Sequence, residues 1–221
     1  MVFSPCDLGI PSSRRRRYTI LIHRSRCVTP TRLQFDAAKT FAEMFYRRLA
    51  TTGHVYWCAP EDYLHEALKP MTKRKHLPPT KPTGEQWDFR ELLPAGAESK
   101  LVHYERSCAK KKRRLNCIVN LQQNTWFLNT LSQKAPCLMT QTSSLWSMVH
   151  QRLLLSSERL LVNGINVFDD RNMSERYAIE LLILKGLLSP AQIANLLGNG
   201  MHHAAIGSIL MFVLSSIEMA I

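Results

Sequence analysis

The chain has 221 residues, enough for one ordinary domain or slightly more, and 45% of them are hydrophobic, which argues against wholesale disorder. It carries 29 Lys and Arg against 17 Asp and Glu, a net charge of +12 that lies entirely within residues 1–120. We therefore expect an acidic partner, nucleic acid first and an anionic membrane surface second, whereas the composition excludes collagen, coiled-coil arrays and disulfide-stapled mini-proteins.

Five stretches within residues 1–121 carry a recognisable pattern. Residues 18–22 are β-branched and apolar, which predicts a buried strand, and the apolar spacing of residues 33–49 predicts a helix. Five prolines among Lys and Arg favour an irregular insertion over residues 69–97, because proline interrupts both helices and strand pairing. A basic helix over residues 98–114 and a short strand over residues 117–121 follow.

The last 66 residues are predicted to be helical. One helix begins with residues 156–162, and Ser174 caps a second helix that stops at a glycine. The Ser-Pro-Ala-Gln sequence from Ser189 begins a third, with serine as N-cap and glutamine at the capping-box position. A fourth helix runs from near Met201 to the last residue. Its stretch free of charge and histidine, residues 204–217, has 14 residues, short of the roughly 20 that span a bilayer, so a core helix is favoured and no membrane partner is expected.

The six cysteines include no C-x-x-C pair, and the N-terminus has no apolar signal core. We therefore expect reduced thiols in a nuclear protein, with a cytoplasmic location left open. A zinc site could draw only on scattered ligands such as His23 and Cys27. Buried free thiols explain the cysteines better, so no metal is expected.

Residues 9–16 read G-I-P-S-S-R-R-R and precede the apolar stretch. This segment resembles the G-V-P-Q-x-R-x-R motif of cytosine-5 DNA methyltransferases, with Arg14 and Arg16 at the two arginines and Ser12 in place of Gln. The resemblance implies catalytic roles for Arg14 and Arg16. In the family the second arginine hydrogen-bonds the flipped cytosine, and a guanidinium that donates to cytosine O2 polarises the ring toward attack at C6. By itself, a run of four arginines is more typical of a solvated surface or a nuclear-import patch.

A second segment, residues 152–164, reads R-L-L-L-S-S-E-R-L-L-V-N-G. It is similar to the family's R-x-L-T-P-R-E stretch and the Q-G-F that follows, with matches at Arg152, Leu154, Glu158 and Gly164. It departs from the family at Ser156 (for Pro), Asn163 (for Gln) and Ile165 (for Phe). The resemblance implies a structural role for Arg152, Glu158 and Gly164, with the glutamate as partner of a buried or half-buried arginine. The P-C-L-M-T sequence that ends at Thr140 resembles the stretch that closes the family's target-recognition region, which implies DNA contact there.

A third segment, L-G-N-G-M at residues 197–201, precedes the last apolar helix. It is similar to the family's terminal G-N-x-V motif, with Met201 at the Val position. The resemblance implies that Asn199 and Met201 bind the cofactor S-adenosylmethionine. Taken alone, the segment is more typical of a helix–glycine–helix connection in which asparagine caps a helix.

Between the first two segments, residues 51–135 fit the place of the target-recognition region. Its Lys and Arg side chains are expected to contact the phosphates of double-stranded DNA, which supplies affinity without sequence choice. The interleaved aromatics form either a nucleic-acid surface or a small core. The expected DNA contacts are the basic run Lys110, Lys111, Lys112, Arg113 and Arg114.

The family's remaining motifs are missing from the sequence. It has no F-x-G-x-G cofactor loop, no Glu-Asn-Val and no Pro-Cys-Gln nucleophile, since neither Pro5-Cys6 nor Pro136-Cys137 is followed by Gln. The chain is therefore expected to be a C-terminal half, completed within a longer product or by a second chain, that transfers no methyl group alone. The alternative is a non-catalytic basic module that binds DNA. An RNA binder is a weaker option, because no RNA-binding signature is present.

The fold implied by the resemblance is α/β. We expect the trailing part of a Rossmann-like methyltransferase domain over residues 1–50, a target-recognition region over residues 51–150, and a helical segment over residues 151–221 that returns to the catalytic domain. The last apolar helix would pack on the missing half. Left alone, it would expose an apolar stripe that favours aggregation or a partner.

Overall fold

The structure, a computed structural model, describes residues 1–22, 27–28, 31–110, 116–126, 132–139, 144–168 and 187–219. It mixes helices with small sheets, as expected for an α/β chain, and helices outweigh strands. The four strand pairings among these residues are all antiparallel. The parallel sheet of a Rossmann-like domain is therefore not among the described strands.

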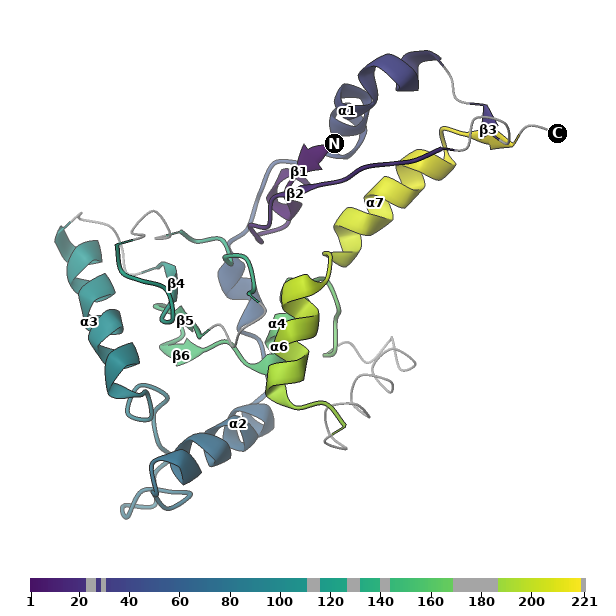
Figure 1. The fold of residues 1–221 in the computed structure, drawn as a ribbon. Coiled ribbons are helices and arrows are strands. Elements are labelled where there is room, and N and C mark those ends of the chain that lie inside the picture. The colour runs from purple at the N-terminus through teal and green to yellow at the C-terminus, as the bar shows by residue number, and fades with distance from the viewer. Residues whose placement is uncertain are drawn as a thin grey trace.

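The two ends of the chain build one elongated arm (Figure 1). Strand β1 (Val2–Phe3) pairs with β2 (Arg16–Arg17), and helix α1 (Thr31–Phe45) lies beside them. Helix α7 (His203–Leu214) completes the arm, and β3 (Cys27–Val28) pairs with β7 (Glu218–Met219) at its far end. Aromatic and aliphatic side chains from both ends of the sequence form the core of the arm: Phe3, Tyr18, Phe41, Ala205, Ile209 and Phe212.

The buried strand predicted for residues 18–22 is wrong. The only strand there is β2, two residues earlier, and Leu21 is 92% exposed. Tyr18 is buried, and its N–H donates to the carbonyl of Met1 (2.8 Å). Strand β1 is too short to pair with the chain beyond Tyr18, so the apolar residues that follow have no neighbouring strand among the described residues to bury them.

The helix predicted for residues 33–49 is confirmed as α1, with different ends and a kink at Asp36 (φ −142°, ψ 34°). The helix stops at Phe45 because the backbone that follows forms hydrogen bonds outside the helix. The N–H of Arg47 donates to the carbonyl of Asp7 (2.9 Å), and Arg47 forms a parallel bridge with Leu8. This bridge ties the chain after α1 to the turn between β1 and β2.

The second part of the molecule, the body, is built around a three-stranded sheet and two helices (Figure 1). Helix α2 (Glu61–Arg74) and helix α3 (Ala95–Lys110) pack on one core, with α3 burying Leu101, Tyr104 and Cys108 at helical spacing. Strands β4 (Ile118–Asn120), β5 (Leu145–Ser147) and β6 (Arg152–Leu153) follow in that order across the sheet. The strand predicted at residues 117–121 is confirmed.

The irregular insertion predicted for residues 69–97 is wrong at both ends. Residues 69–74 continue α2 despite Pro70, because Leu68 and Thr72 are buried and the last turn carries basic residues that suit the helix dipole. Helix α3 begins at Ala95, three residues earlier than expected. The segment between these helices is irregular, as predicted.

Within the described residues of the C-terminal part lie two short helices and α7. Helix α4 (Ser156–Val162) and helix α6 (Pro190–Asn199) confirm two predicted helices, and the helix capped by Ser174 lies outside the described residues. The capping box at Ser189 is confirmed: its Oγ accepts from Gln192 N (3.3 Å), and Gln192 Oε1 accepts from Ser189 N (2.8 Å). The fourth helix stops at Leu214, short of the predicted end, because residues 218–219 pair with β3.

The stretch Ala191–Leu214 is long and apolar enough, by length and composition alone, to cross a membrane, and 33% of its most apolar window is buried. In the structure its backbone is divided. Helix α6 ends at Asn199, Gly200 is extended (φ −62°, ψ 164°), and α7 begins at His203. The result is two helices of 10 and 12 residues, each shorter than the roughly 20 that a membrane span needs.

Candidate functional site

Three stretches of the chain meet around the Arg14 side chain: its own, residues 135–138 and residues 197–198. Its Nη1 donates to the carbonyl oxygens of Leu138 (3.2 Å) and Leu197 (3.3 Å), and its Nη2 donates to that of Gly198 (2.5 Å). The backbone reinforces the first contact, since Ser13 N donates to Ala135 O and Ala135 N donates to Pro11 O, both at 2.8 Å. Residues some 120 to 180 positions apart are thereby joined at one guanidinium.

Arg14 is 4% exposed, and its backbone N–H donates to Ser4 Oγ (2.9 Å). Burial lowers the pKa of its guanidinium, and the nearby Arg16 charge lowers it further, whereas the Cys137 thiol beside it acts in the opposite direction. Only Nε lacks a partner among the described residues, and it too is buried. Arg14 is therefore placed to hold three segments together rather than to reach a substrate.

Arg16 lies at the same junction but faces solvent. One of its terminal nitrogens, Nη2, is 3.5 Å from the Gly198 carbonyl that Arg14 also contacts. Its side chain is exposed on strand β2. Of the two arginines predicted to be catalytic, Arg16 is the one with donors free to meet a ligand.

The predicted cofactor residues sit at the end of α6. Asn199 is exposed, and its Nδ2 donates to Asn195 Oδ1 (3.0 Å) on the same helix. Met201 is 49% exposed. Both side chains are thus open to solvent, and these two residues by themselves do not enclose S-adenosylmethionine.

A second junction lies next to Arg14 and involves a histidine that the sequence analysis did not single out. His202 is 3% exposed and caps α7, with Nδ1 accepting from Ala204 N (3.2 Å). Burial, together with the charges of His203 and Arg14, lowers the pKa of His202 to about 4. Its Nε2 is buried without a partner among the described residues. A histidine before a helix is recognisable from sequence as a cap, but its burial is not.

The turn after α4 fits against this histidine. Asn163 Nδ2 donates to the carbonyl of Leu197 (3.0 Å), and Asn163 O accepts from His203 N (2.9 Å). Gly164 has φ +86°, and a Cβ atom there would lie 3.0 Å from His202 Cε1. Gly164, predicted to be structural, therefore stands where both the backbone conformation and the neighbour favour glycine.

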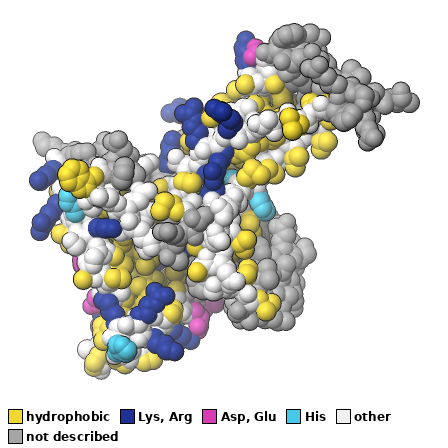
Figure 2. All heavy atoms as spheres, viewed as in Figure 1, with side chains coloured by type: hydrophobic (Ala, Val, Ile, Leu, Met, Phe, Trp, Pro, Cys, Tyr) yellow, Lys and Arg dark blue, Asp and Glu magenta, His cyan; other side chains and the backbone are white. Residues whose placement is uncertain are grey.

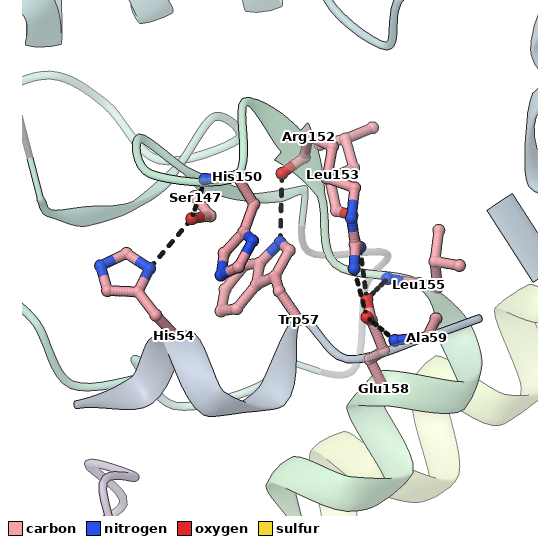
Figure 3. A network of polar contacts seen from close by, with 9 residues as sticks. All are labelled: His54, Trp57, Ala59, Ser147, His150, Arg152, Leu153, Leu155 and Glu158. Carbon is pink, nitrogen blue, oxygen red and sulfur yellow. Dashed lines mark hydrogen bonds and ion pairs between the residues drawn. The ribbon is translucent and has the colours of Figure 1, made fainter. Parts of the chain in front are cut away.

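Arg152 and Glu158 form a buried, two-pronged ion pair (Figure 3). Arg152 Nη1 donates to Glu158 Oε2 (2.8 Å) and Nη2 donates to Oε1 (2.6 Å). The carboxylate also accepts from the backbone N–H groups of Leu155 and Ala59, both at 2.9 Å. The glutamate is fully buried, so the structure brings these two predicted residues together as a link between β6, α4 and the start of the body.

A serine and two histidines lie beside this pair (Figure 3). His54 Nδ1 is 2.9 Å from Ser147 Oγ, and its Nε2 is 2.8 Å from the carbonyl of Asn116, so Ser147 donates to the histidine. The serine oxygen also accepts from His150 N (3.0 Å). Ser147 is 0% exposed, and no substrate can reach its oxygen. The arrangement therefore fixes a loop and is not a nucleophilic site.

The predicted DNA contacts lie mostly outside the described residues. Lys110 is exposed at the end of α3, whereas residues 111–114 and Thr140 are not described. A cavity of about 1080 Å³ opens between the ends of α2 and α3, with three cations, Arg74, Lys75 and Lys100, around apolar side chains. Two of these cations already donate to backbone carbonyls, those of Glu91 and Gln122.

The described cysteines are Cys6, Cys58, Cys108, Cys117 and Cys137, and none of them forms a disulfide. Within the described ranges no three His, Cys, Asp or Glu side chains gather as metal ligands. His23 and the Cys27 side chain, the only zinc ligands considered from sequence, lie outside what the structure describes.

No known protein family model matches the chain, and no curated protein is similar to it.

Proposed function

We propose that the chain is the C-terminal part of a cytosine-5 DNA methyltransferase, which transfers a methyl group from S-adenosylmethionine to C5 of cytosine in DNA once a catalytic half completes it. The observation that carries the proposal is the meeting at Arg14. Arg14 belongs to a segment that resembles one motif of the family. Two further family-like stretches, the one that contains Leu138 and the one that contains Leu197 and Gly198, lie within hydrogen-bond distance of its side chain, and the three follow one another in the family's order.

The two arginines then have different roles. Arg14 positions the segments, because its terminal nitrogens are taken up by carbonyls. Arg16 is the catalytic candidate, since its exposed guanidinium could donate to O2 of a cytosine flipped out of the duplex. That hydrogen bond favours attack at C6 by drawing electron density toward O2.

The missing half would supply the rest of the reaction: the cysteine nucleophile, the glutamate and the glycine-rich loop. It would also supply the parallel sheet of a Rossmann-like domain, on which α7 would pack. Asn199 and Met201, exposed on the α6–α7 connection, would then contribute to the S-adenosylmethionine site together with that loop.

The test begins with the native protein. Transcript sequencing and the intact mass of the protein will reveal an upstream extension, or a second co-purifying chain, that carries F-x-G-x-G, Pro-Cys-Gln and Glu-Asn-Val. The completed enzyme is expected to transfer labelled methyl to duplex DNA, and Arg16→Ala is expected to lower kcat by about 100-fold. A native 25.4 kDa chain without such a partner, or methyl transfer by this chain alone, would contradict the proposal.

A second candidate function is a non-catalytic DNA-binding module derived from the same family. The net charge of +12 favours it, since that charge would attract duplex DNA with or without a catalytic half. Salt-dependent DNA binding by a native chain that has neither extension nor partner would select this alternative.

A further inference from the structure

Five exposed arginines lie at the end of the arm that adjoins the body. Three follow one another in the sequence at the β2 strand, and two follow helix α1 about thirty residues later. We call this set the arginine surface: Arg15, Arg16, Arg17, Arg47 and Arg48. Figure 2 shows Lys and Arg side chains grouped where the arm meets the body.

Backbone contacts bring the two groups together. Arg47 N donates to Asp7 O (2.9 Å), and Arg47 bridges Leu8 in the turn between β1 and β2. At Gly9 (φ +80°) a Cβ atom would lie 3.2 Å from that of Arg47, so the glycine permits the close approach.

Side chains place the two groups next to each other as well. Tyr46, which precedes Arg47, lies 6.4 Å from Phe3 between ring centroids. Burial and the Asp7 carboxylate raise the pKa of Tyr46, and the charge of Arg15 acts against them. Phe3 pairs with Arg16 across β1 and β2, so its ring contact with Tyr46 places the end of α1, with Arg47 and Arg48, against the hairpin that carries Arg16 and Arg17.

The charges on this surface are not neutralised within the part of the chain that the structure describes. The described ion pairs of Lys and Arg are at Lys39, Lys69, Lys81, Arg90 and Arg152. The Asp7 carboxylate, in the turn that Arg47 contacts, accepts from the N–H of Ser4 (2.8 Å). Residues 1–50 carry ten Lys and Arg against three Asp and Glu, so the local sequence offers few other partners.

The arginine surface is also held on a rigid support. The buried Arg14 side chain fixes β2 through three carbonyls, and Phe3 fixes β1 in the aromatic core of the arm. Exposed cations on an anchored hairpin lose little freedom when they bind. A guanidinium also matches two phosphate oxygens at once, which an ammonium does not.

We propose that the arginine surface binds the phosphate backbone of duplex DNA. This inference rests on the proposed function and deepens it, because it moves the main phosphate contact from the predicted Lys110–Arg114 run to the arm. Arg16, which contacts the Gly198 carbonyl from the same surface, would then face the base while its neighbours hold the strand.

The test measures duplex DNA binding by the full chain over a range of salt concentrations. The variant Arg15→Ala/Arg17→Ala/Arg48→Ala removes three charges and leaves Arg16 intact. The matched control, Lys39→Ala/Lys69→Ala/Lys81→Ala, removes three charges that are paired with Asp36, Glu66 and Glu91. Thermal unfolding of both variants verifies that they fold.

Each phosphate contact adds about 0.9 to the slope of log K against log salt on B-form DNA. The arginine variant is therefore expected to lose about 2 to 3 from this slope and to bind at least 10-fold more weakly near physiological salt, whereas the control loses less than about 1. If the two variants lose affinity and slope equally, the arginine surface is not the binding site, although the proposed function stands. If the wild-type chain prefers single-stranded RNA to duplex DNA, both proposals are overturned.

Discussion

The ion pair between Arg152 and Glu158 is the most buried charged contact among the described residues, with side-chain exposures of 9% and 0%. A buried pair is weak evidence for added stability, because both charges lose their hydration. Removing one partner, by contrast, is strongly destabilising, since the remaining charge stays buried without a partner. The two backbone N–H groups that donate to Glu158 would lose their acceptor as well.

We predict that Glu158→Gln lowers the free energy of unfolding by about 3 to 5 kcal/mol, the cost of leaving a buried arginine unpaired. The control is Glu66→Gln, which breaks the exposed pair with Lys69 and is expected to cost less than about 1 kcal/mol. Urea unfolding monitored by circular dichroism measures both values. Equal losses in the two variants would mean that the buried pair has no special role.

His202 makes stability depend on pH. Its pKa is about 4 in the folded chain, below the ordinary value of 6.5, so the unfolded chain binds the proton more readily. The free energy of unfolding is therefore expected to fall as the pH drops from about 6.5 to about 4, by about 3 kcal/mol, and this contribution levels off at lower pH.

His202→Asn removes the titrating group and keeps a side chain that can cap α7. We predict that the loss of stability between pH 7 and pH 4.5 becomes smaller in this variant by about 2 kcal/mol or more. The same substitution at His103 is the control, because it also replaces a histidine by asparagine but at an exposed position on α3. An unaltered pH profile in His202→Asn would show that other groups cause the acid sensitivity.

At the scale of elements, features that depend on residues close in sequence were predicted better than features that depend on packing between distant segments. The capping box at Ser189 was predictable because its partners are three residues apart. The strand predicted after Arg17 failed because a strand needs a neighbour, and β1 ends too soon to be one. Residues 69–74 became helix because buried contacts outweigh the intrinsic cost of Pro70.

The turn at Gly164 connects α4 to the cap of α7, and its positive φ (+86°) favours glycine. We predict that Gly164→Ala destabilises the chain by about 1 to 3 kcal/mol, because of the positive φ and the contact with His202. Gly96→Ala is the control, since a Cβ atom at this position in the first turn of α3 meets open space and alanine favours a helix. Chemical unfolding of the two variants should change in opposite directions. If Gly164→Ala leaves the free energy of unfolding unchanged, the turn accommodates the added Cβ atom, and the prediction is contradicted.

At the scale of the molecule, only part of the candidate site could be predicted from the sequence. Arg14 and Arg16 belong to one sequence motif and Gly198 to another, and spacing along the chain does not reveal that the two motifs are in contact. The arginine surface was missed for the same reason, because the second pair of arginines follows a helix whose end is set by a bridge to Leu8. Burial of His202 likewise depends on packing against residues 163–164, which no local pattern encodes.

The outer face of α7 is apolar and uncovered by the described residues. Leu210, Met211 and Leu214 are 53%, 65% and 69% exposed, and Figure 2 shows hydrophobic side chains along the arm. We predict that the isolated chain self-associates through this face and that Leu210→Gln/Leu214→Gln makes it more monomeric without lowering stability by more than about 0.5 kcal/mol.

Analytical ultracentrifugation over a range of concentrations measures this association. The control variant Leu187→Gln/Leu196→Gln changes two leucines that are 63% and 59% exposed away from the helix face. If the α7 variant still associates and the control variant does not, the contact lies elsewhere than on α7.

The arm joins the first and last parts of the chain, and this has a consequence for how the protein is made. Phe3 and Phe41 are synthesised early, but their core is completed only when Ile209 and Phe212 have left the ribosome. Strand β3 likewise waits for residues 218–219. The N-terminal segments of the arm therefore lack part of their core until α7 has been made, and during that time their aromatic side chains and positive charge are open to ribosomal RNA and chaperones.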